Sequence, residues 1–168
     1  DALAKAGLGV SPPAAPLAAV LASIGAAPGQ STLTAEGELP LHLQDAISNE
    51  WTFAGFGFLR EEPARALAMA EAAHERAPQL CFQALQLQGA AYASMNPPRL
   101  ELSFERFAEG ITIAHRINPA WAVDSPKLRW SDAGNRPYLR LLHSNLLVLL
   151  QADRRTEALQ LAQRMLLI

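Results

Sequence analysis

Residues 51–94, WTFAGFGFLREEPARALAMAEAAHERAPQLCFQALQLQGAAYAS, contain the pattern that decides the fold. Alanine and leucine are the commonest residues in this stretch, and both lose little conformational freedom when they enter a helix. Its prolines fall where helices begin and end: Glu62-Pro63 suits a helix start, and Pro78 suits a helix end. The stretch therefore predicts three consecutive helices joined by short turns.

The same helical character extends outward from this stretch to most of the chain. Helices are expected over residues 41–59, 63–78, 80–94, 100–117 and 137–151 and from residue 154 onward, with a linker at 120–136. Residues 1–40 are rich in Ala, Pro and Gly and are expected to form a separate N-terminal segment. Within it, residues 14–24 predict one short helix and residues 25–40 a loop.

Composition supports an all-α protein. The chain has 168 residues, of which 50% are hydrophobic, so it can bury a core and is not disordered throughout. Only 7% are aromatic, so the core is expected to consist mainly of Ala and Leu. The alternation of apolar and polar residues that is typical of strands is scarce.

Charge and cysteine content limit the partners and the compartment. The 14 basic and 16 acidic residues nearly balance, and Lys5 and Lys127 are the only lysines, so no clustered basic surface for nucleic acid is expected. The longest apolar stretch, residues 14–27, is interrupted by Pro16 and is shorter than the ~20 residues of a membrane span. The single cysteine, Cys81, permits no internal disulfide. An intracellular location is expected, in the cytoplasm or in an organelle after removal of a targeting peptide.

Two successive helix pairs share a spacing of large and small side chains. In the first pair the positions that carry the spacing are Trp51, Ala54, Gly55, Phe58, Ala66, Ala70, Ala73 and Pro78. In the second pair they are Leu85, Gln88, Gly89, Tyr92, Ile111, Ala114 and Pro119. Small residues at these positions let two helices approach closely, and large residues fill the space toward the next pair.

These spacings resemble the tetratricopeptide-repeat family over about residues 41–168. The resemblance implies helix hairpins over residues 41–78, 79–119 and 137–168 that stack into an α-solenoid. The second unit departs from the family because Phe107 replaces a small residue, and the first helix of the third unit contains no glycine. An unrelated helical bundle with Ala-rich seams is the alternative.

The resemblance also implies a binding face, because the first helices of such arrays line the concave side. The neutral polar or basic side chains expected there are Asn49, Thr52, Gln83, Gln86, Arg140, His143 and Asn145. Side-chain amides present both a donor and an acceptor and so suit an extended peptide backbone. One subclass of the family grips C-terminal carboxylates with lysines, but both lysines of this chain lie outside the expected repeat helices.

The last helix predicts a second surface for a partner. Leu159, Ala162 and Leu166 are expected to pack inward on the preceding helix. The apolar residues left for a partner are then Leu161, Met165, Leu167 and Ile168.

No catalytic, cofactor or metal motif is evident. Glu71 and His74 have the spacing of a di-iron ligand pair, but a second such pair is missing. The sequence therefore predicts a scaffold for protein–protein interaction, such as a structural or accessory subunit of a larger assembly, that binds protein subunits and is not an enzyme. An RNA-binding helical repeat, or a helical accessory domain of a larger enzyme, remains as an alternative.

Overall fold

The protein is described by a computed structural model that covers residues 45–122, 128 and 134–167. These residues form six α-helices and one 3-10 helix and contain no strand, so the all-α prediction is confirmed for this part of the chain. The elements are α3 (Ala46–Phe58), α4 (Pro63–Arg76), α5 (Phe82–Ser94), α6 (Leu100–Ile117), η2 (Pro119–Ala122), α7 (Arg136–Gln151) and α8 (Arg155–Leu167). The expected N-terminal segment lies outside the described residues.

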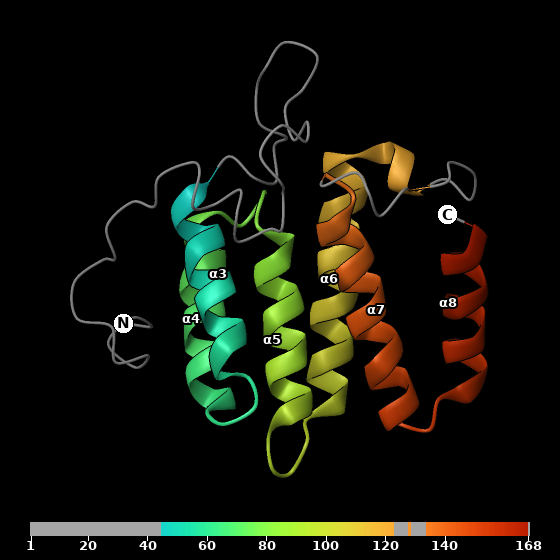
Figure 1. Cartoon of the computed structure of the whole chain (residues 1–168), viewed down its shortest axis with the longest axis horizontal. Helices are drawn as coiled ribbons and strands as arrows, with labels where there is room; N and C mark the ends of the chain where they lie inside the picture. The colour runs from blue at the N-terminus through green and yellow to red at the C-terminus, as the bar shows by residue number, and fades with distance from the viewer. Residues whose placement is uncertain (1–44, 123–127, 129–133, 168) are drawn as a thin grey trace.

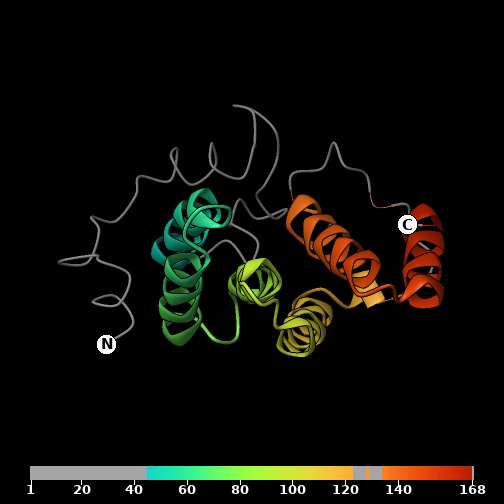
Figure 2. The ribbon, with the colours of Figure 1, turned by 90° about the horizontal axis from the view of Figure 1, so that it is seen from below.

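Each helix packs on the one that follows it in the chain, and α5 also contacts α3 and α7. Three tight connections, α3–α4, α5–α6 and α7–α8, lie at the same end of the helices, so the chain forms three successive hairpins (Figure 1). Seen along the helices, α3 and α7 lie toward one side, α4 and α6 toward the other, and α5 lies between them (Figure 2). The helices are thus arranged side by side in chain order, with the α3/α4 hairpin at one end and α8 at the other.

Local chemistry explains where the helices begin. The side chain of Asp45 accepts a hydrogen bond of 2.8 Å from the backbone N–H of Ser48 and so caps α3. Pro63 begins α4, where its missing N–H leaves no helical bond unmade. The helix predicted over residues 100–117 has these bounds in the structure, and the last helix begins at Arg155.

The largest core cluster joins α5, α6, η2 and α7. Trp121, in the predicted linker, is buried and stacks on Tyr138 with ring centroids 4.9 Å apart, and it meets the edge of Phe82 at 5.9 Å. Leu141 and Phe107 are fully buried in the same cluster. Burying each of these side chains stabilises the fold by about 1.5–3 kcal/mol, so this cluster holds the second hairpin and α7 together.

Two glycines mark the closest helix contacts. A methyl group on Gly55 of α3 would lie 2.4 Å from Cδ2 of Leu87 on α5. A methyl group on Gly89 of α5 would lie 2.9 Å from the ring of Phe107 on α6. Helices can approach this closely only where one of them lacks a side chain. Of the helices that the structure describes, none is long and apolar enough to cross a membrane.

Candidate functional site

A pocket of about 290 Å³ lies where α3, α5 and α7 meet. Phe53 and Phe56 of α3, Gln83 and Gln86 of α5, and Arg140 of α7 line it. Each of the three hairpins supplies its first helix to this surface, which we call the α3–α5–α7 face. Three of the residues predicted for partner binding are therefore brought together, although they lie up to 57 positions apart in the chain.

The two glutamines of the pocket have different hydrogen-bonding states. Gln86 donates from Nε2 to Oγ of Ser144 over 2.8 Å, which joins α5 to α7. Gln83 is only 3% exposed, and its Oε1 has no hydrogen-bond partner in the described structure. A buried polar atom without a partner is costly to the folded protein. This oxygen is itself fully covered, so the pocket offers it as an acceptor only to a ligand that displaces a neighbouring side chain.

Arg140 adds positive charge at the edge of the pocket. Its side chain is half-buried. Burial, and then the neighbouring Arg136, lower the pKa of the Arg140 guanidinium from its ordinary value. The guanidinium of arginine nevertheless stays protonated in proteins, so Arg140 carries a positive charge. The pocket thus combines aromatic rings, an amide acceptor and a cation.

Two predicted binding residues are buried between helices instead, and their assignment to an open binding face was wrong. Thr52 is fully buried; its Oγ1 donates to the carbonyl of Ser48 over 2.8 Å and lies 3.6 Å from Sγ of Cys81. Asn49 is also buried, and its amide donates to the carbonyl of Asp45 over 3.0 Å. Both side chains satisfy the backbone of α3 and face the packed interior.

The two remaining polar residues predicted for the binding face, His143 and Asn145, do not line this pocket. His143 is exposed on α7 and does not line the pocket. Asn145 faces another direction and lines a second hollow of about 430 Å³ between α6, α7 and α8. Asn145 lies five positions after Arg140, which is about 140° further around α7, so it points away from Arg140, and its assignment to the α3–α5–α7 face was wrong.

The orientation predicted for the last helix was reversed. Leu161 and Met165 pack against the main core cluster, and Ala158 beside them is buried. Leu159 and Leu166, expected to pack inward, are exposed. The side chain of Leu167 and all of Ile168 lie outside the described residues.

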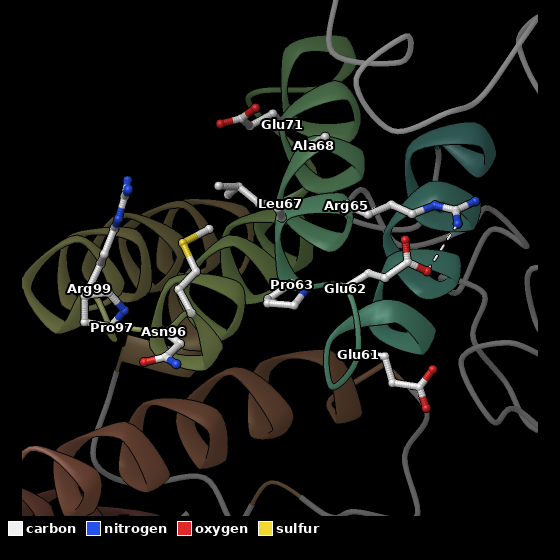
Figure 3. Close-up of a pocket in the computed structure, with 12 residues that line it drawn as sticks. Glu61, Glu62, Pro63, Arg65, Leu67, Ala68, Glu71, Asn96, Pro97 and Arg99 are labelled. Atoms are coloured by element: carbon white, nitrogen blue, oxygen red, sulfur yellow. Dashed lines mark hydrogen bonds and ion pairs between the residues drawn. The ribbon is translucent and has the colours of Figure 1, made fainter.

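A larger hollow of about 880 Å³ lies between the start of α4 and the α5–α6 connection (Figure 3). Glu61 and Glu62 lie on the α4 side of this hollow, and Asn96 and Arg99 lie across from them. The only ion pair drawn, Glu62 with Arg65, spans 3.4 Å. These charged side chains are mostly exposed, so water already satisfies them. This hollow is therefore less specific than the pocket on the α3–α5–α7 face.

Phe53 and Phe56 are the site residues that sequence reasoning missed. They lie three positions apart and thus on one face of α3. This spacing was the only sequence feature that could have identified them, and it does not stand out because Trp51 and Phe58 lie on the same helix. Among the described residues, no group of three or more His, Cys, Asp and Glu side chains could hold a metal ion.

Comparison with known proteins gives no match. No family model matches the sequence, and no curated protein and no solved structure matches the chain significantly.

Proposed function

We propose that this chain is a tetratricopeptide-like helical repeat protein that acts as a scaffold for protein–protein interaction, as a structural or accessory subunit of a larger assembly inside the cell. The sequence spacings of the first two units support this proposal, as do three successive hairpins whose first helices share one face. The observation that carries it is the pocket on that face. Side chains from three hairpins converge there around the unpartnered carbonyl of Gln83.

The pocket chemistry suits an extended segment of a partner protein. An apolar side chain of that segment would lie against Phe53 and Phe56, whose rings are partly buried. If a neighbouring side chain of the pocket moves aside, a backbone N–H of the segment would donate to Oε1 of Gln83, which is covered and without a partner in the described structure. Arg140 would favour a segment that carries negative charge next to the apolar residue.

The test is a binding selection with a library of 12-residue peptides of varied sequence and fluorescence anisotropy of the selected peptides. We expect peptides with one large apolar residue, and we expect binding to weaken about tenfold or more in Gln83→Leu and Phe56→Ala. The matched control is Gln160→Leu on α8, which leaves the pocket intact. Selected peptides that bind all variants equally would refute the site, and salt-sensitive binding of RNA at low ionic strength would favour the RNA-binding alternative.

A further inference from the structure

The pocket on the α3–α5–α7 face has the size and lining of a site for one aromatic side chain. Its volume of about 290 Å³ lies at the lower limit of the roughly 300–1,000 Å³ of pockets that hold drug-sized ligands. Phe53 and Phe56, which are partly buried, supply its apolar lining. Aromatic rings prefer another ring as a neighbour, either offset and parallel or edge to face.

Gln86 offers such a side chain an acceptor. The residue is only 5% exposed, and its Nε2 donates to Oγ of Ser144, so the carbonyl end of the amide is turned away from that bond. Within the described structure, Oε1 of Gln86 accepts no hydrogen bond, and it is not one of the fully covered side-chain atoms. Because Gln86 lines the pocket, this oxygen is an acceptor that a ligand can reach.

Gln83 offers a donor one turn earlier on α5. Its Oε1 is fully covered, but its Nε2 is not one of the covered atoms and makes no hydrogen bond to any residue that the structure describes. Residues three apart on a helix lie on one face, with Cβ atoms about 5–6 Å apart. A ligand group placed between the two amides can therefore accept from Gln83 and donate to Gln86 at the same time.

One type of side chain satisfies both amides and the aromatic lining. A hydroxyl both donates and accepts, but serine and threonine lack a ring, and phenylalanine lacks the hydroxyl. The indole of tryptophan only donates, so it would leave Nε2 of Gln83 without an acceptor. A protonated histidine would be repelled by Arg140, which also lines the pocket. Tyrosine combines an aromatic ring with a hydroxyl.

We propose that the pocket binds a tyrosine side chain of the partner protein, whose hydroxyl donates to Oε1 of Gln86 and accepts from Nε2 of Gln83. This inference rests on the proposed scaffold function and names the anchor residue of the partner segment. Ser144 is a positioning residue, because it accepts from Nε2 of Gln86 and so directs Oε1 of that amide to the pocket. A second copy is a poor source of the tyrosine, since Tyr138 is fully buried and Tyr92 is half-buried.

The test compares pools of 12-residue peptides that differ at one central position. This position is tyrosine, phenylalanine, 4-methoxyphenylalanine, tryptophan or glutamine, and the other positions are random. Each pool is passed over the immobilised 168-residue chain, and the bound peptide is measured. We expect the tyrosine pool to bind about tenfold or more better than the phenylalanine pool, because a site built around a hydroxyl rejects an analogue without it. The methoxy ring accepts but cannot donate, so its pool should bind no better than phenylalanine.

Variants of the chain assign this preference to the amide. Gln86→Leu should remove the preference for tyrosine over phenylalanine, whereas Gln86→Glu, which still accepts a hydrogen bond, should retain it. Ser144→Ala should reduce the preference, since the amide of Gln86 can then turn; a merely structural effect would weaken both pools equally. The matched control is Gln160→Leu on α8, which should leave the preference unchanged. Circular dichroism checks that each variant folds.

Equal binding of the tyrosine and phenylalanine pools to the native chain overturns the proposal, and this comparison needs no variant. A tryptophan or glutamine pool that binds better than the tyrosine pool also overturns it, as does a tyrosine preference that survives Gln86→Leu. If these pools still lose binding in Phe56→Ala, the scaffold site stands and only the tyrosine anchor fails. If no pool binds, the proposed function fails as well. Displacement of the tyrosine pool by an equal concentration of N-acetyltyrosine amide would assign the pocket to a small molecule and overturn the proposal.

Discussion

Substitution of Gly89 by leucine should destabilise the protein strongly. Gly89 faces Phe107 of α6, and a methyl group there would lie 2.9 Å from both Cε1 and Cζ of the ring. The ring is fully buried, so it cannot swing into solvent. Nor can α6 easily move away, because Ser103 donates to the carbonyl of Gly89 over 2.7 Å.

The magnitude follows from two opposing terms. Overpacking a close helix contact costs about 1–3 kcal/mol of unfolding free energy, whereas replacing a helical glycine by alanine returns about 1 kcal/mol. Gly89→Ala should therefore destabilise by about 0–2 kcal/mol. Gly89→Leu adds three more carbons to the same space and should cost more than about 3 kcal/mol. For a chain of this size that lowers the melting temperature by about 6–12 °C.

Thermal unfolding followed by circular dichroism measures both variants. The matched control is Gly57 of α3, which has no neighbouring atom within 4 Å of an added methyl group. Gly57→Ala should raise stability by about 0.5–1 kcal/mol, because only the backbone term changes. Phe107→Leu should reduce the cost of Gly89→Ala, since the two side chains compete for one space. A wild-type melting temperature for Gly89→Leu would show that α5 and α6 do not pack at this register.

Three further outcomes follow from buried polar groups. Ser103→Ala removes a buried hydrogen bond to the carbonyl of Gly89, which lies inside α5 and keeps its helical bond, and should cost about 0.5–1.5 kcal/mol in chemical denaturation; unchanged stability would contradict this bond. Burial raises the pKa of Cys81 to about 11, so the native thiol should resist a thiol reagent at pH 8 and react only on unfolding. Burial lowers the pKa of His115, which contacts the hydroxyl of Tyr138 at 2.8 Å, so the unfolded chain binds the proton more readily. Stability should thus be highest above the ordinary histidine pKa of about 6.5 and fall as the pH drops below it, and His115→Gln should flatten that slope.

Helix positions could be predicted because their signals are local. Pro63 begins α4 at the predicted residue, and the helix after Arg99 ends before Asn118 as expected. The start of α3 depends on the side chain of Asp45, and the residues before it lie outside the described structure. Local capping and proline chemistry act within a few residues, so the sequence alone contains them.

The sequence shows that Phe107 is large where the repeat pattern has a small residue, but it does not show how the hairpin accommodates the ring. A large residue replaces a small one on α6, which by itself suggests a loosened hairpin. In the structure Gly89 lies opposite and leaves room for the ring, so the two helices remain closely packed. The compensation joins residues 18 positions apart on different helices, and only the hairpin geometry reveals it.

The residues that line the pocket on the α3–α5–α7 face could be predicted only in part. Gln83, Gln86 and Arg140 were identified, but residues 53–58 of α3 include no polar side chain. When a helix is apolar all around, its periodicity does not separate a buried side chain from one that lines a pocket. Trp51 is buried in the interior, whereas Phe53 and Phe56 line the pocket, and the sequence offers no means to tell them apart.

The reversed orientation of α8 shows what decides between two apolar sides of one helix. Leu161 and Met165 form one side, and Leu159 and Leu166 form another, with similar apolar area on each. Helix periodicity allows either side to pack inward. The choice depends on the existing core, because Leu161 and Met165 pack against the cluster that α6 and α7 share, whereas Leu159 and Leu166 do not belong to it. The chain buries the side that reaches an existing core, and Leu159 and Leu166 on the other side remain exposed.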